Sequence, residues 1–85
     1  MRVIFDRAGA GPVTELYAWV VVPPSGDEGL LIADLPEPYG FPMAMVGSDR
    51  EMIASLEPIA QRARDFLGCP IKLMRFTGLQ EVRRL

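Results

Sequence analysis

Two adjacent carboxylates, Asp27 and Glu28, are the first residues in this sequence whose types and spacing suit chemistry, and a glycine flanks the pair on each side. Carboxylate oxygens bind Ca²⁺ and Mg²⁺, but these ions need more oxygen ligands than two neighbouring acids supply. No third ligand follows at loop spacing, so the pair favours a turn. The alternative is a small-ligand binder or a minimal carboxylate-based enzyme, using Asp27, Glu28 or Asp34 in a cleft completed by a dimer.

The sequence contains no histidine, which removes the commonest general base and a usual zinc ligand. Cys69 follows Gly68 at the predicted end of a helix, where the helix dipole disfavours a thiolate. This cysteine is therefore expected to be a small buried residue rather than a nucleophile. We predict no catalytic, metal or cofactor site, and a protein that is not an enzyme.

The charges are divided unevenly along the chain, whose net charge is −2. Residues 1–57 carry three basic and nine acidic side chains, whereas residues 58–85 carry six basic and two acidic ones. This asymmetry fits a basic patch for an acidic partner or for the acidic half of a second copy, and it equally fits a helix dipole complemented by arginines plus a solvated tail. The basic residues lack interleaved aromatics and a glycine-rich phosphate loop, so nucleic acid is not an expected partner.

The chain of 85 residues predicts one small domain, residues 1–85, with a core that supplies little net stability. Its 49% of hydrophobic and 24% of charged residues are typical of a globular rather than a disordered chain. No apolar run approaches the roughly 20 residues of a transmembrane helix, and the apolar start is too short for a signal peptide. With a single cysteine, these features predict a cytoplasmic protein without membrane contact.

Residues 15–22 form the strongest predicted strand, because they are rich in aromatic and β-branched side chains. Two consecutive prolines end it, and the turn-forming residues that follow predict a hairpin to an antiparallel strand at residues 30–35. Residues 36–42 hold three prolines and predict an extended loop. Short strands are predicted at residues 2–6 and 43–46.

One helix is predicted between Ser48 and Gly68, with apolar residues at steps of three and four. Ser48 and Glu51 have the spacing of a capping box, and Gly68 supplies the left-handed stop. Pro58 lies within the apolar stripe and predicts a kink. Residues 71–77 then alternate as a last strand. The resulting fold class is α+β in the order β-β-β-β-α-β, a mostly antiparallel sheet with one kinked helix packed on one face.

The strand at residues 15–22 is apolar on both of its faces. Alternation places Tyr17, Trp19 and Val21 on one face and Leu16, Val20 and Val22 on the other. One helix covers one face of such a sheet, so the second face needs another cover, and the register does not decide which face this is. The candidates are a second copy of the chain, its own N-terminal segment and tail, or another protein or ligand; a homodimer is favoured, because one self-complementary patch suffices.

Aromatic residues dominate interface energetics, so they are the candidate anchors of this interface. The candidates are Tyr17, Trp19 and Val21 on the sheet and Tyr39 and Phe41 in the proline-rich loop. The loop is expected to act either as a recognition surface or as a lid over the core. The predicted function is a non-enzymatic protein-interaction or regulatory module that homodimerises through the sheet face carrying Trp19.

Several short stretches resemble a group of short bacterial proteins of no established function. They are Tyr17-Ala18-Trp19, Gly26-Asp27-Glu28-Gly29, and Gly68, Pro70, Ile71, Leu73 and Phe76. The likeness spans residues 17–76 and implies a bacterial source.

The chain also resembles the layout of the HicB-like antitoxin domain, through Asp34-Leu35-Pro36 and the capped segment from Ser48 to Glu51. That resemblance implies a toxin-neutralising role. The chain departs from the family in having PYGFPMAMV in place of a glycine-rich strand, in lacking the capping threonine, and in having no separate DNA-binding segment.

Overall fold

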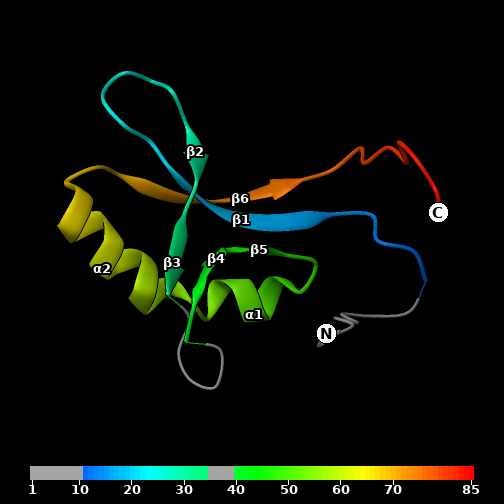
Figure 1. Ribbon diagram of the computed structural model, residues 1–85, viewed down its shortest axis with the longest axis horizontal. Helices are drawn as coiled ribbons and strands as arrows, with labels where there is room; N and C mark the ends of the chain where they lie inside the picture. The colour runs from blue at the N-terminus through cyan, green and yellow to red at the C-terminus, as the bar shows by residue number, and fades with distance from the viewer. Residues whose placement is uncertain (1–10, 35–39) are drawn as a thin grey trace.

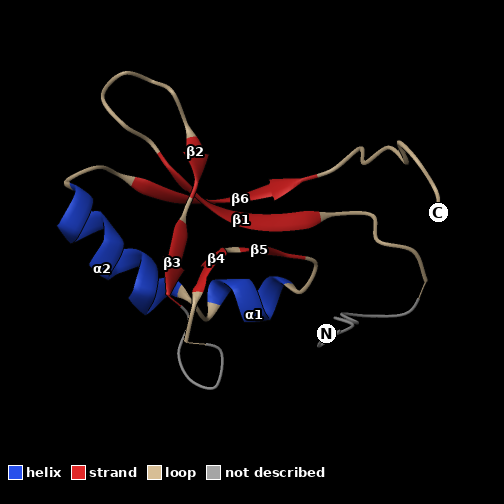
Figure 2. Cartoon of the chain, viewed as in Figure 1, coloured by secondary structure: helices blue, strands red, loops and turns tan. Residues whose placement is uncertain are grey.

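The computed structural model describes residues 11–34 and 40–85, in which antiparallel strands combine with two helices (Figures 1 and 2). The elements are β1 (Leu16–Val21), β2 (Gly29–Leu30), β3 (Ile32–Asp34), β4 (Pro42–Ala44), β5 (Val46–Gly47), α1 (Arg50–Ala54), α2 (Glu57–Leu67) and β6 (Ile71–Phe76). The predicted α+β fold class is confirmed. The strand predicted at residues 2–6 lies outside the described residues.

β1 is the central strand of the larger sheet. It pairs with β6 along one edge over all six of its residues. On the other edge, Tyr17 and Ala18 pair with β5, and Val20 and Val21 pair with β2, which confirms the predicted hairpin. All three neighbours are antiparallel to β1, so β5 and β6 run parallel to each other on opposite sides of it, and the helices form the connection between them.

The strands predicted at residues 30–35 and 43–46 are each divided in two. The chain leaves the edge of β1 at Leu31, forms the separate hairpin β3–β4, and rejoins that edge at Met45. Three backbone hydrogen bonds hold this point: the N–H of Leu31 donates to the carbonyl of Trp19 (2.8 Å), that of Met45 to Leu31 (2.8 Å), and that of Trp19 to Met45 (3.1 Å). Both polar backbone groups of Trp19 are therefore bonded on this edge.

The helical region consists of two helices, where the sequence predicted one helix with a kink. The N–H of Ser55 still bonds to the carbonyl of Glu51 (2.9 Å) at the end of α1, and α2 begins after Leu56. Pro58 consequently lies in the first turn of α2, where the missing N–H has no intrahelical acceptor to lose. The chain thus places the proline at a helix start instead of distorting a helix interior.

The sequence predicted Ser48 as the cap of the first helix, but the structure shows that Asp49 caps it. The Asp49 carboxylate accepts hydrogen bonds from the N–H groups of Glu51 (3.0 Å) and Met52 (3.3 Å). The predicted stop at Gly68 is confirmed, with φ of 69° in the left-handed region that favours glycine.

The hydrophobic core lies between the larger sheet and the helices. Its buried members are Trp19, Leu31, Met45, Ile53 and Ala60. We call the sheet face that meets the helices the inner face and the opposite one the outer face. Because side chains alternate along a strand, the inner face of β1 carries Tyr17, Trp19 and Val21, and its outer face carries the even-numbered residues.

Candidate interaction surface

The aromatic residue chosen from the sequence as the main anchor, Trp19, is part of the core. Only 7% of it is exposed, and its indole N–H donates to the carbonyl of Ile53 in α1 (2.7 Å). Tyr17 and Val21 are half-buried on the same inner face and pack against the core. A dimer through this face would require the helices to leave it, so the structure corrects the predicted interface: the open face is the other one.

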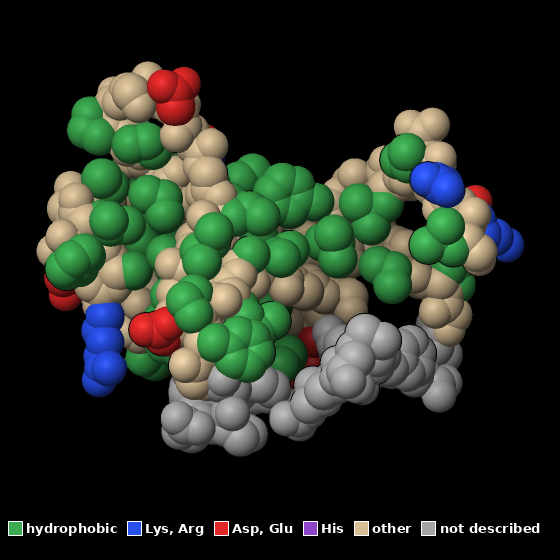
Figure 3. Space-filling view, viewed as in Figure 1, with side chains coloured by type: hydrophobic (Ala, Val, Ile, Leu, Met, Phe, Trp, Pro, Cys, Tyr) green, Lys and Arg blue, Asp and Glu red, His purple; other side chains and the backbone are tan. Residues whose placement is uncertain are grey.

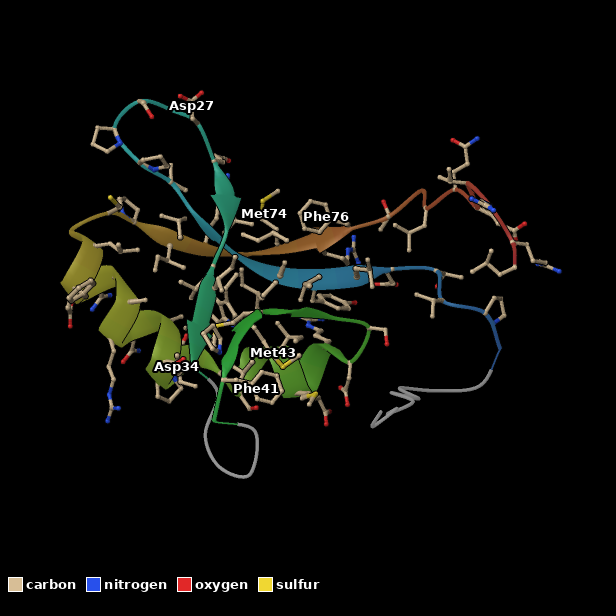
Figure 4. All side chains as sticks on the ribbon, in the orientation of Figure 1. Asp27, Asp34, Phe41, Met43, Met74 and Phe76 are labelled. Carbon is tan, nitrogen blue, oxygen red and sulfur yellow. The ribbon has the colours of Figure 1, made fainter. Side chains whose placement is uncertain are left out.

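The remaining predicted anchors come from the proline-rich loop. Phe41 is 52% exposed just before β4, close to Met43 in Figure 4. Tyr39 lies outside the described residues. Phe41 is therefore accessible to a partner, but it belongs to the margin of the β3–β4 hairpin and not to the larger sheet.

The outer face of the sheet is apolar across four strands. Its apolar members are Leu16, Ala18 and Val20 from β1, Met74 and Phe76 from β6, Leu30 from β2 and Val46 from β5; Lys72 of β6, opposite Val20, lies on the same face. On this face Ala18 and Val20 are buried, whereas Leu30 is 46% and Val46 37% exposed. Ile32, which is 64% exposed, belongs to the separate β3–β4 hairpin.

The space-filling view (Figure 3) shows where hydrophobic and charged side chains lie on one side of the molecule. Hydrophobic side chains gather across the middle of the molecule, and acidic and basic side chains lie at the margins (Figure 3). Met74 and Phe76 lie on the same side of β6 (Figure 4). At one margin, the ammonium group of Lys72 forms an ion pair with the carboxylate of Glu28 (2.6 Å). This ion pair neutralises the charge that Lys72 brings to the outer face. The outer face is thus an apolar surface with a polar rim, the usual composition of an interface.

The three carboxylates considered for chemistry do not converge. Glu28 is engaged by Lys72, Asp27 lies in the β1–β2 loop, and Asp34 lies at the far end of β3 (Figure 4). The N–H of Asp27 donates to the hydroxyl of Ser25 (3.4 Å), as expected of a turn. Within residues 11–34 and 40–85, no group of three or more acidic or cysteine side chains is arranged to hold a metal ion.

Cys69 and the described pocket offer little for chemistry. Cys69 is half-buried, and its thiol lies 3.5 Å from the carbonyl of Leu67. A pocket of about 100 Å³ lies between α2 and the sheet, and it is smaller than typical ligand sites. It is lined by Trp19, Glu57, Ala60, Gln61, Arg64 and Ile71.

The hydroxyl group of Tyr17 has a shifted pKa. Its hydroxyl donates to the carboxylate of Glu15, and this hydrogen bond, followed by burial, raises the pKa of Tyr17 above its ordinary value of 10.0. The neighbouring cations Arg50 and Arg75 act in the opposite direction. The neutral phenol is therefore the form that the fold favours.

Comparison of the chain with protein-family models, curated proteins and solved structures finds no match. The resemblances noted in the sequence therefore stay predictions. None of the helices in the described parts of the chain has the length and apolar character needed to cross a bilayer.

Proposed function

We propose that the chain is a non-enzymatic protein-interaction module, with a regulatory rather than a chemical role, and that it homodimerises through the outer face of its sheet. The observation that carries this proposal is the continuous apolar surface from β2 and β5 across β1 to β6, with Leu30 and Val46 substantially exposed. Apolar surfaces of more than a few hundred Å² seldom remain open on soluble monomers.

The occupant that we propose for this face is a second copy of the chain. Seven hydrophobic residues of the described chain are buried, a small core for a domain without a disulfide. Packing two sheets face to face, about 10 Å apart, would add a second apolar layer to this core. A two-fold axis lying between the sheets needs only one self-complementary patch.

The proposal is tested with Val46→Lys, which places a charge on the outer face at strand β5, next to the central strand β1. Val46 is 37% exposed and its cross-strand neighbour is the small Ala18, so a lysine stem has room to reach water in the separate chain. In the dimer both copies would bury an unpaired ammonium, at a cost of several kcal/mol. We expect the dissociation constant to rise by about 100-fold or more, since each 1.4 kcal/mol is tenfold.

Multi-angle light scattering and far-UV circular dichroism provide the readout. The Val46→Lys variant is expected to keep the wild-type spectrum and to have half the wild-type mass, and Leu30→Lys, at 46% exposure on β2, should weaken assembly in the same direction. The matched control is Phe66→Lys, because Phe66 is 90% exposed on α2 and not on the outer face. An unchanged mass in both outer-face variants would refute the assignment.

A further inference from the structure

A second unsatisfied surface of the sheet is the free edge of β6. Among the described residues, β6 pairs with β1 alone, so one of its edges carries no strand (Figure 2). The six residues Ile71–Phe76 contain no proline or glycine, and they pair with β1 in an unbroken register. Such a regular edge is a template for another strand unless it is covered or interrupted.

The hydrogen bonds of β1 determine which backbone groups point to this edge. Trp19 lies opposite Leu73, but its N–H and carbonyl are bonded to Met45 and Leu31 on the far side of β1. One step beyond the strand, the N–H of Val22 donates to the carbonyl of Pro70 (2.9 Å), so even-numbered residues of this segment face β1. The N–H and C=O groups of the odd-numbered residues 71, 73 and 75 therefore point outward.

We propose that β6 of a second copy pairs antiparallel with this edge, around a two-fold axis at Leu73. In that register Leu73 lies opposite Leu73 of the second copy, and Ile71 lies opposite Arg75. All three outward residues of each strand then exchange N–H and C=O bonds within the bounds of β6, whereas a shifted register leaves part of them unpaired.

The side chains of β6 suit this self-pairing. Leu73, which is 38% exposed on the inner face, meets its own copy at the axis. Arg75 lies beside Ile71, and Lys72 beside Met74, so no like charges are directly opposite and the aliphatic stems cover apolar neighbours. The strand is therefore complementary to itself, which is the observation that selects a second copy as the occupant of the edge.

This edge pairing goes beyond the proposed function, because it uses outward backbone groups of the odd-numbered residues and not the side chains of the outer face. Its axis is perpendicular to the sheet, whereas the axis of the face-to-face dimer lies in the plane between two sheets. Perpendicular two-folds that intersect generate a closed assembly of four copies. Within it, edge pairing would place two outer faces side by side on one continuous sheet.

The test is Leu73→Pro, with Leu73→Ala as the matched control. Proline at this position removes an N–H that the β1–β6 ladder does not use, and prolines are tolerated at such outward positions of edge strands. Alanine shortens the side chain but keeps the donor. We expect Leu73→Pro to halve the mass of the assembly at unchanged circular dichroism, and Leu73→Ala to keep the wild-type mass; a wild-type mass for Leu73→Pro would overturn the proposal.

Amide hydrogen exchange of the unmodified chain keeps the proposal testable if the proline variant does not fold. The amide of Met74, directed at β1, should be protected at every concentration, whereas that of Leu73 should gain protection as concentration rises. A Leu73 amide that exchanges freely in the assembled protein would refute the pairing. So would protection that does not depend on concentration, because the edge would then be filled from within the chain.

The two proposals fail separately. If Val46→Lys halves the mass and Leu73→Pro does not, the outer-face dimer stands and edge pairing is wrong. If only Leu73→Pro halves the mass, the reverse holds. With both interfaces present, the double variant should have the mass of one chain.

Discussion

Replacing Trp19 by Phe tests whether this residue joins the sheet to the helices. The indole N–H donates to the carbonyl of Ile53 at 2.7 Å, and both residues are buried. Phe cannot make this bond, and a buried hydrogen bond contributes about 1 kcal/mol to stability. The smaller ring also leaves a cavity, which we place at about 1–2 kcal/mol from large-to-small substitutions in cores.

The expected total is a loss of about 2–3 kcal/mol in the free energy of unfolding. For a domain of this length, each kcal/mol lowers the melting temperature by about 4–8 °C, so a decrease of about 8–24 °C is expected in thermal unfolding. Urea unfolding followed by far-UV circular dichroism, at one fixed protein concentration, measures both variants without depending on the indole signal. Phe66→Leu, on the exposed surface of α2, is the control and should change stability by less than about 0.5 kcal/mol. A Trp19→Phe variant as stable as this control would refute the assignment of Trp19 to the core.

Two further predictions concern local contacts. Asp49→Ala should lower stability by about 1 kcal/mol in urea unfolding, whereas Ser48→Ala should have little effect, because the carboxylate of Asp49 accepts the two N–H bonds at the start of α1; the opposite order would restore Ser48 as the cap. Glu15→Gln should lower the pKa of Tyr17, measured by phenolate absorbance in a Tyr39→Phe background. Since the folded-state pKa of Tyr17 is raised above 10.0, this contact stabilises the fold fully below pH 10 and its contribution is lost as the pH rises through the folded-state value; an unchanged pKa in Glu15→Gln would contradict the contact.

The parts of the fold that could be predicted are those specified by local signals. The strand at β1 has a dense run of β-branched and aromatic residues, and the prolines and turn residues after it define the hairpin. Gly68 ends the second helix because only a residue without a Cβ adopts its φ of 69° at little cost. The strand β6 is also predictable, because its side chains alternate in type along the sequence.

The parts that could not be predicted depend on contacts between distant residues. Both faces of β1 are apolar, so alternation identifies two faces without saying which one meets the helices. What decides between them is the packing of Trp19 against Leu31, Met45 and Ile53, which are 12 or more residues away in the chain. The sequence held one indication of the inner face. A buried Trp needs an acceptor for its indole N–H, and a helix carbonyl supplies one, so the face of β1 that carries Trp19 is the one expected to meet the helices.

The divisions of the predicted elements have similar causes. The predicted strands are divided at Leu31 and Met45, whose backbone groups form hydrogen bonds with the backbone of Trp19. These contacts join distant parts of the chain, so local propensity does not predict them. Ser48 and Asp49 are adjacent and both are good cap residues, so the sequence does not separate them. Pro58 is compatible either with a kink inside one helix or with the first turn of a new helix. No side-chain cap precedes α2, so the sequence gives no sign that a second helix begins at Glu57.

The mass of the wild-type protein in solution, measured by light scattering over at least a tenfold range of concentration, tests the central claim most directly. Burial of the outer face by a second copy predicts an even multiple of the 9.4 kDa mass of the chain, two copies if the face alone is used and four if β6 also pairs. A mass of 9.4 kDa throughout the range would contradict self-association through the outer face.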